Sequence, residues 1–358
     1  DRHWVEKAVA RARRRNPTLN SSIFHFIRDV LLCRTDAYVT EAAKKQRLAF
    51  VLKLQQVTSP VTAKGVEDTA FYVYNRLVSL NEVGGEPAAF GIPLERFHRE
   101  NAERAAAWPA SMLGTTTHDT KRSEDVRARI NVLSELPDEF RRRLHLWSRL
   151  NRRHKRELND TQAPDRNEEL LLYQTLLGAW PNEPLDAEGR KTFVARIQGY
   201  MQKAMKEAKV NTSWTNPDEE WEQAVLGFVA DVLDPAKSDR FLRDFVAFQR
   251  RIARPGAFNG LSQVVLKLTC PGVPDTYQGN ELWDYSLVDP DNRRPVDFEK
   301  RQALLASLDE AAAEDRRGLC NELMASWTDG RVKLYVTAEL LRLRRRLPQL
   351  FMQGSYAP

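Results

Sequence analysis

The sequence predicts a mostly α-helical protein that also contains part of a (β/α)8 barrel. Two observations support this fold class. Apolar residues recur at three- and four-residue spacing over most of the 358 residues, as they do in helices that pack on a core. Three short segments instead resemble buried strands, and each runs into a polar loop, as strands do at the active-site face of such a barrel. Three strands are too few to close a barrel, so we expect an incomplete one.

The first strand is expected after a helical N-terminal region. Residues 1–55 have helical apolar spacing, with an N-cap predicted within Asn20-Ser21-Ser22 and a third helix over 36–55. The segment 57–63 is short and rich in β-branched residues, which predicts a strand that ends in a loop at 64–65.

The second strand follows a helix predicted over residues 93–108. Residues 111–117 resemble a strand, and the chain then enters a polar loop that contains His118 and Asp119. A helix is expected to begin near Arg122. This segment therefore repeats the arrangement of a strand followed by a polar loop.

The rest of the chain is predicted to be helical, apart from the third strand. The apolar run 261–268 is read as that strand, and the Gly- and carboxylate-containing segment 270–281 as its loop. Helices are expected again up to about Pro348. Between the second and third strands lies a large helical insertion, with polar or Pro-containing breaks at 159–167, 181–189, 211–218 and 234–238.

The net charge of +6 raises the question of an anionic partner such as nucleic acid. The arginines are grouped in segments with helical apolar spacing and nearby carboxylates, as on solvated helix faces. We therefore expect no nucleic-acid partner. A basic helical binding module without catalysis stays open as an alternative, which salt-sensitive binding to DNA or polyphosphate would favour.

Composition restricts the remaining classes. An apolar fraction of 42% and a charged fraction of 29% are typical of a globular protein, and no stretch has the unbroken apolar length of a membrane span. Cys33, Cys270 and Cys320 have no CxxC spacing, which argues against disulfides or a thiolate zinc site and makes a reducing cytoplasm the expected compartment. The chain begins at Asp1 without an initiator Met or a signal peptide, which predicts a cut.

Taken alone, the adjacent His118 and Asp119 are a weak signal, because such pairs more often cap a loop than catalyse a reaction. Their context makes them more informative. The segment 111–119 resembles the His-Asp region at the end of strand seven in the α-amylase superfamily, and 272–281 with 289–296 resembles its strand-eight region. Within that superfamily, 59–72 and 118–129 are similar to the maltooligosyltrehalose synthase family. The resemblance covers nearly the whole chain and is strongest over 57–137 and 270–298.

The resemblance implies a function. Enzymes of this family convert the reducing-end α-1,4 linkage of a maltooligosaccharide to an α,α-1,1 linkage, an intramolecular transglucosylation that makes trehalose units. Asp119 matches the carboxylate that stabilises the transition state, and His118 matches a sugar contact. Because this isomerisation must exclude water, a closed pocket is expected. Another hydrolase or transglycosylase of the superfamily stays an alternative, which product analysis would decide.

The sequence contains further candidate sugar contacts. Lys64 and Lys121 each lie in a motif loop and are candidate substrate-binding donors, although ion pairs with nearby carboxylates explain them equally well. We expect most of Phe71, Tyr72 and Tyr74 to be core residues. We expect the carboxylates of the last barrel region to shape its loops by capping and salt bridges, namely Asp275, Glu281, Asp289 and Asp291, with Arg293 as an ion-pair partner.

The family's nucleophile and acid/base carboxylates precede strand seven, and nothing before residue 57 resembles them. We therefore expect an internal to C-terminal fragment that is inactive alone and lacks the first barrel strands and a C-terminal β-sandwich. A complementary chain carrying strands one to five is a possible partner. No metal or cofactor is implied, since the six His form no ligand motif. The expected organisation is a helical segment (1–56), strands six and seven (57–125), the helical insertion (126–260), strand eight with its loop (261–298) and C-terminal helices (299–358).

Overall fold

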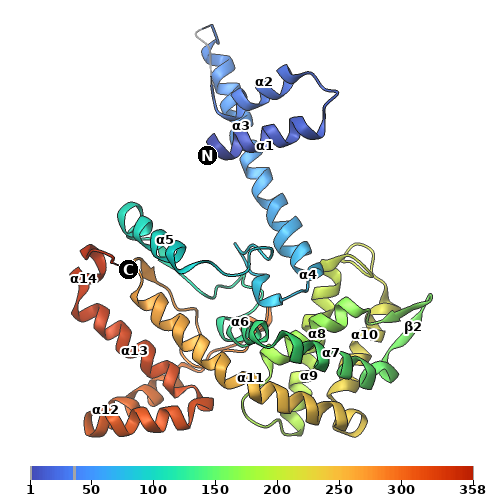
Figure 1. The fold of residues 1–358 in the computed structure, drawn as a ribbon, viewed down its shortest axis with the longest axis vertical. Helices are drawn as coiled ribbons and strands as arrows, with labels where there is room; N and C mark the ends of the chain where they lie inside the picture. The colour runs from blue at the N-terminus through green and yellow to red at the C-terminus, as the bar shows by residue number, and fades with distance from the viewer. Residues whose placement is uncertain (1, 35–37, 358) are drawn as a thin grey trace. The chain divides into compact units, whose positions relative to one another are not determined.

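The computed structural model describes residues 2–34 and 38–357, and helices make up most of it. The chain divides into two compact units, residues 1–68 and 69–358. Among the residues described, no helix combines the length and the apolar composition that crossing a bilayer requires. Figure 1 shows the elements of each unit along the chain.

The N-terminal unit consists of helices. α1 packs against α2, whose first turn is capped by Asn20, the first residue of the predicted N-cap segment 20–22. The Asn20 side chain accepts a hydrogen bond from the Ser22 amide at 2.9 Å. Thr40 caps α3 in the same way, so this helix begins at Glu41; residues 36 and 37 of the predicted helix lie outside the described residues. The bounds are α1 (Arg2–Arg15), α2 (Ser21–Leu31), α3 (Glu41–Thr62) and a π-helical segment (Ala63–Ala70).

The strand predicted over 57–63 is wrong, because α3 continues through these residues to Thr62. The residues described contain only two strand pairs, and neither includes this segment. An isolated strand would leave its backbone groups without partners, whereas a helix satisfies them within its own chain. This local advantage outweighs the β preference of Val57 and Val61, whose side chains are exposed.

The second unit contains two strand pairs. β1 (Met112–Leu113) lies within the predicted second strand and pairs in parallel with β4 (Val273–Pro274), in the register Met112 to Val273. β2 (Arg156–Leu158) and β3 (Thr161–Ala163) form an antiparallel hairpin within the helical insertion. The hairpin was not predicted, because its strands are three residues long and mostly polar.

The strand predicted over 261–268 is also wrong, because this run is the last part of α11 (Pro235–Thr269). Val264 and Leu268 are buried one helical turn apart, which is the pattern of a packed helix. A short apolar run alone does not distinguish a buried strand from a buried helix. The strand occurs later, as β4, inside the segment that was expected to be loop.

Apart from residues 71–73, residues 348–353 and the last part of α11, the helices of the second unit lie in regions that were predicted to be helical. α8 begins with a capping box, in which Asp165 and Glu168 each bond the other's backbone amide. α11 is kinked at Ser238 and α12 at Asp315. The bounds are α4 (Phe71–Val73), α5 (Leu94–Ala107), α6 (Glu124–Asn131), α7 (Pro137–Asn151), α8 (Arg166–Ala179), α9 (Ala187–Ala208), α10 (Glu219–Leu233), α11, α12 (Phe298–Ala325), α13 (Arg331–Arg346) and α14 (Pro348–Gln353).

The main core lies in the helical insertion. Its centre is an aromatic cluster in which the Trp147 ring lies edge-on to Tyr173 and Phe248 and is tilted against Phe245, with centroid distances of 5.3–5.9 Å. A second, smaller apolar cluster joins α12 and α13. α6 packs against both α8 and α11, so the residues after the His118–Asp119 loop are held by the main core.

Candidate functional site

The His118–Asp119 pair lies in a tight turn between β1 and α6. The Asp119 amide donates to Oγ1 of Thr117 at 3.2 Å, and the Thr120 hydroxyl donates to the Thr117 carbonyl oxygen at 2.8 Å. These bonds fix the backbone on both sides of the pair. The turn therefore follows a strand of the parallel pair, as the sequence predicts.

The two side chains of the pair contact each other and stay accessible. Nε2 of His118 lies 3.3 Å from Oδ2 of Asp119, and the side chains are 64% and 69% exposed. An exposed carboxylate accepts hydrogen bonds from hydroxyl groups, and an imidazole beside it can donate or accept one. The pair can therefore bind a polyhydroxyl ligand from one side of the turn.

Asn292 connects this turn to the loop after β4. Its amide nitrogen donates to the carbonyl oxygens of His118 at 3.0 Å and Thr117 at 3.4 Å, and the residue is 7% exposed. A buried side-chain amide that bonds two successive carbonyls holds them at a fixed spacing. The two predicted motif regions, 117–120 and 289–296, thus meet at this point.

Glu82 holds the other side of the turn. Its two carboxylate oxygens accept hydrogen bonds from the backbone amides of Lys121 at 2.8 Å and Arg122 at 3.1 Å, and the residue is buried. The Arg127 guanidinium lies 3.6 Å from the same carboxylate. Charge-assisted bonds of this kind are among the stronger ones in proteins. Glu82 therefore fixes where the turn ends and α6 begins.

Arg122 anchors the turn to the insertion core. Its side chain is buried, and it donates to the carbonyl oxygen of Val78 at 3.2 Å and to the hydroxyl of Tyr200 at 2.6 Å. Tyr200 belongs to α9, so this bond joins the turn to a helix of the insertion. A buried guanidinium that lost these hydrogen bonds would destabilise the fold. The bonds therefore hold the turn firmly to the insertion.

A cluster of buried charges lies at the start of α6. Nζ of Lys333, from α13, is 2.8 Å from Oε1 of Glu124 and 2.7 Å from Oδ2 of Asp125. Lys267 of α11 lies 3.6 Å from Glu124. The Asp125 carboxylate also accepts the Asp284 amide at 2.8 Å. We call Glu124, Asp125, Lys267 and Lys333 the buried charge cluster.

The pKa values within the buried charge cluster move in opposite directions. Burial alone would raise the pKa of Glu124, but attraction to the ammonium groups of Lys333 and Lys267 lowers it to about 2. Burial raises the pKa of Asp125 to about 6, despite the attraction of Lys333. Burial would lower the pKa of Lys333, but the charges of Asp125 and Glu124 raise it. Lys333 is therefore held in its charged form.

The two candidate lysines lie in different surroundings. Lys121 is in the same unit as Asp119 and is 5% exposed, so little of its surface is open to a ligand. Lys64 belongs to the N-terminal unit, where Nζ is 2.6 Å from Oδ2 of Asp68. This contact is an ion pair with a nearby carboxylate, which is the alternative to sugar binding for Lys64. Both residues stay predictions as sugar contacts.

The other residues singled out from the sequence are mainly structural. Phe71 and Tyr72 are buried, as expected, whereas Tyr74 is 44% exposed. Oε2 of Glu281 accepts hydrogen bonds from the Gly279 amide and from Arg301, both at 3.0 Å, so this carboxylate shapes its loop.

The turn after β4 contains the predicted salt bridges. Arg293 pairs with Asp289 at 2.7 Å. Arg196 of α9 binds both oxygens of Asp291 at 2.8 Å. The Asp275 amide donates to the Leu113 carbonyl oxygen at 2.8 Å across the strand pair.

Sequence reasoning missed the residues that position the turn. Glu82, Lys333 and the amide of Asn292 are each distant in sequence from His118, and no local pattern links them to it. Their signal is burial of a polar side chain, which becomes visible only in the folded structure. In the sequence, Glu82 lies two residues before Gly84-Gly85, a pattern that is typical of a turn.

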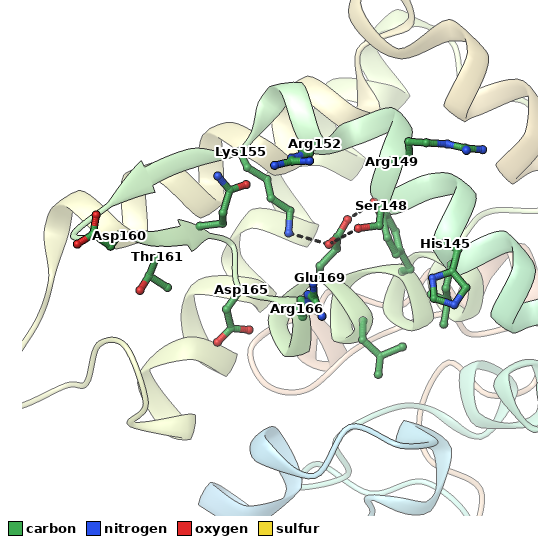
Figure 2. Close-up of a pocket in the computed structure, with 14 residues that line it drawn as sticks. His145, Ser148, Arg149, Arg152, Lys155, Asp160, Thr161, Asp165, Arg166 and Glu169 are labelled. Atoms are coloured by element: carbon green, nitrogen blue, oxygen red, sulfur yellow. Dashed lines mark hydrogen bonds and ion pairs between the residues drawn. The ribbon is translucent and has the colours of Figure 1, made fainter.

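A separate cavity of about 860 Å³ lies within the insertion, between the β2–β3 hairpin, α7 and α8 (Figure 2). On one side of it, Nζ of Lys155 is 2.7 Å from Oε2 of Glu169, which also accepts a bond from the Ser148 hydroxyl at 3.1 Å. Both charged side chains are nearly buried and neutralise each other. None of the residues that line this cavity belongs to the motif regions, so it is not the site of the His118–Asp119 pair.

The part of the chain that the structure describes can be compared with the geometry that metal ligands need. No three His, Cys, Asp or Glu side chains gather there in an arrangement that could hold an ion. What the residues of the turn offer is a carboxylate, an imidazole and backbone groups, which suit hydrogen bonding to hydroxyl groups.

Comparison with known proteins gives these residues a context. No protein-family model matches the sequence. A relative from Mycobacterium tuberculosis (strain H37Rv), named as a maltooligosyl trehalose synthase, is 42% identical over 312 residues, which is 86% of this chain and 35% of the relative. The chain thus spans about a third of the length of the curated relatives that it matches.

Solved structures agree with this relationship. Maltooligosyltrehalose synthase from Arthrobacter ramosus is 36% identical, with a TM-score of 0.77 over 98% of this chain and 40% of that one. A hypothetical maltooligosyl trehalose synthase from Sulfolobus tokodaii is 32% identical, with a TM-score of 0.69 over 94% of this chain and 45% of that one. Sequence and fold therefore agree that the chain belongs to the maltooligosyltrehalose synthase family.

Proposed function

We propose that this chain supplies part of the active site of an enzyme that converts the reducing-end α-1,4 linkage of maltooligosaccharides to an α,α-1,1 linkage. Asp119 is the carboxylate that stabilises the transition state, and His118 contacts a hydroxyl of the same sugar. The observation that carries this proposal is the exposed pair His118–Asp119, held on a turn that Glu82, Arg122 and Asn292 fix from three sides.

The chemistry requires such a carboxylate. A retaining glycosyl transfer uses one carboxylate as nucleophile and another as acid and then base, roughly 5 Å apart, around a sugar that becomes positively charged. A third carboxylate that is already in place stabilises that charge without rearranging during the reaction. Asp119 has the accessibility for this role, and the bonds around Thr117 and Asn292 keep its backbone in position.

Isomerisation places a further demand on the site. The glucose released from the reducing end must stay, turn over and offer its anomeric hydroxyl before water attacks the glycosyl enzyme. Enclosure of the site is therefore part of the proposal. Lys64 and Lys121 are each proposed as a sugar-hydroxyl donor, in the motif loop that the sequence identified for it.

The strand pair β1–β4 is proposed to be strands seven and eight of a (β/α)8 barrel. Its parallel pairing and the turn that follows β1 support this assignment. Because α3 occupies the place of the expected strand six, β1 and β4 are the two strands assigned to the barrel among the described residues. The remaining barrel strands, the nucleophile and the acid/base residue are proposed to lie in other parts of the enzyme. The partners are then a maltooligosaccharide and the polypeptide that carries those strands, and the chain alone is expected to be inactive.

The test is the variant Asp119→Asn in the complete enzyme that contains these residues. We expect kcat for trehalosyl product to fall by at least about 100-fold, as it does when one preorganised group is lost from a transition state. Because Asp119 is exposed, the thermal unfolding midpoint of the variant should equal that of the wild type. The control is Asp160→Asn, since Asp160 is an exposed carboxylate in the β2–β3 hairpin turn. Unchanged kcat in Asp119→Asn would remove this residue from the active site.

Product analysis in the same assay separates the related activities. Free glucose without trehalosyl product would indicate a hydrolase of the same superfamily, and a new α-1,4 or α-1,6 linkage would indicate a different transglycosylase. The charge distribution favours none of the polyanion-binding alternatives, because exposed arginines such as Arg342 and Arg141 pair with carboxylates.

A further inference from the structure

A groove of about 900 Å³ runs along α9 and faces the turn after β4. Its α9 wall extends from Glu188 to Glu207, a distance of about 28 Å at the helical rise per residue. The opposite wall is formed by residues 288–291 and Arg294. The next residue of that turn, Asn292, bonds the carbonyl of His118, so the groove lies beside the loop that holds the His118–Asp119 pair.

The walls of the groove are held rigidly together. Arg196 of α9 binds both carboxylate oxygens of Asp291 at 2.8 Å, and Nζ of Lys203 donates to the Asp289 carbonyl oxygen at 2.8 Å. These contacts join the middle and the end of α9 to the turn. A preformed groove binds a flexible ligand with less loss of protein entropy than one that must form on binding.

The floor of the groove consists of small residues. Ala195 and Gly199 lie one helical turn apart on the exposed face of α9 and line the groove. A Cβ atom added to Gly199 would have no atom within 4 Å, so open space lies above this residue. Because these two residues have almost no side chain, the floor of the groove is smooth at its centre.

An aromatic ring stands at one end of the groove. Trp214 is 56% exposed, and Nζ of Lys206 lies 4.9 Å from its ring centroid. Lys206 is itself fixed by Glu222 at 3.2 Å. An indole that is supported on one side and open to solvent offers an apolar face together with a ring N–H, which suits the apolar face and hydroxyl edge of a sugar.

The charge of the lining indicates a neutral ligand. Basic and acidic side chains occur in equal numbers around the groove, and several already pair across it, as Arg196 does with Asp291. Such a lining offers both donors and acceptors to hydroxyl groups but no net attraction for a polyanion. The length of the groove fits a chain of several sugar units better than a single sugar.

We propose that the α9 groove binds the α-1,4-glucan chain of the substrate away from the reacting linkage, with Trp214 as a stacking platform and Gly199 as the point where the chain crosses α9. This inference rests on the proposed function for the identity of the ligand. It predicts that long maltooligosaccharides gain affinity from the groove and that maltose does not.

The experiment measures maltoheptaose and maltose binding to the full chain by titration calorimetry. Gly199→Leu fills the floor of the groove, and Trp214→Ala removes the platform; each should lower the affinity for maltoheptaose by about tenfold or more, because central contacts carry most of the binding energy. Gly199→Leu should also keep or raise the thermal midpoint, because Leu favours a helix more than Gly does. Loss of binding therefore cannot be assigned to unfolding if the midpoint is kept.

Matched controls exist for both variants. Gly227→Leu makes the same change on α10 outside the groove, where an added Cβ also has no atom within 4 Å. Trp108→Ala removes another exposed indole, which does not line the groove. Both controls should bind maltoheptaose like the wild-type chain.

The outcomes separate this inference from the proposed function. If the wild-type chain does not bind maltoheptaose, or if the groove variants bind it as well as their controls do, the groove inference is wrong, and the Asp119→Asn assay still decides the function. If the groove variants alone lose binding, the inference holds whatever the result of the Asp119→Asn assay.

Discussion

The ammonium nitrogen of Lys333 lies 2.8 Å from Oε1 of Glu124, although the two residues come from opposite ends of the second unit. Lys333 is fully buried, and it also contacts Asp125, the next residue of α6. Helix α13 is thereby tied to the helix that follows the His118–Asp119 turn.

This contact predicts a large loss of stability in Lys333→Met. Methionine keeps much of the side-chain volume but leaves the buried carboxylates with too little positive charge, which costs about 3–5 kcal/mol when a buried pair is broken. Urea unfolding at neutral pH measures the free energy of unfolding directly. Lys300→Met is the control, because Lys300 is exposed on α12, and it should change stability by less than about 0.5 kcal/mol. A loss below about 1 kcal/mol in Lys333→Met would contradict the burial of its charge.

The pKa of Glu124 predicts a specific acid sensitivity. Its folded value, about 2, lies below the ordinary value of 4.5, so its contribution to stability is complete above pH 4.5 and is lost as the pH falls towards 2. The loss is on the order of 3 kcal/mol. Asp125 acts oppositely, because its raised pKa favours the folded state as the pH falls from about 6 towards 3.8. Unfolding free energies between pH 4.5 and 2 should therefore fall less steeply in Glu124→Gln than in the wild type; parallel curves would argue against the assignment.

The crossing of α6 and α11 predicts that Gly256→Ala is destabilising. A Cβ atom at Gly256 would lie 2.7 Å from Cα of Arg129, which is backbone and cannot move aside independently. Overpacking of this kind costs about 1–3 kcal/mol. Gly227→Ala has open space around it and should instead stabilise its helix by up to about 1 kcal/mol. Thermal or urea unfolding of both variants tests the difference, and a shift of the same sign in both would refute it.

The Glu82 carboxylate predicts the stability of the turn itself. Glu82→Ala leaves the amides of Lys121 and Arg122 buried without their acceptor, at a cost of about 1–3 kcal/mol each. Hydrogen exchange should therefore accelerate at these two amides more than elsewhere in the second unit. Glu86→Ala, an exposed carboxylate in the same segment, is the control. Unchanged exchange at Lys121 and Arg122 would show that another group holds the turn.

Local signals in the sequence predicted most of the helices. The N-cap segment 20–22 predicted the start of α2, and the helical pattern of residues 93–108 predicted α5 to within a residue at each end. The polar and Pro-containing breaks separated the helices of the insertion. These features depend on contacts between residues a few positions apart, which is why the sequence reveals them.

The strands and the supports of the site depend on distant contacts instead. The third strand was predicted over 261–268 but lies at Val273–Pro274, as β4. A strand is defined by its partner, and the partner β1 is far away in sequence. His118 and Asp119 were predicted as site residues from their motif, whereas Glu82, whose carboxylate bonds the end of their turn, was not. Burial of a charged side chain follows from the whole fold and from no local pattern.

The strand pair has a consequence for how relatives of this chain can diverge. The pairing of Met112 with Val273 sets the register of the two strands. Residues 114 to 272 form one excursion of the chain that starts and ends at this strand pair. A helix lengthened or shortened within this excursion would not shift the register, provided that the ends still meet. Evolution can therefore remodel the insertion while the strand that precedes the His118–Asp119 turn stays unchanged.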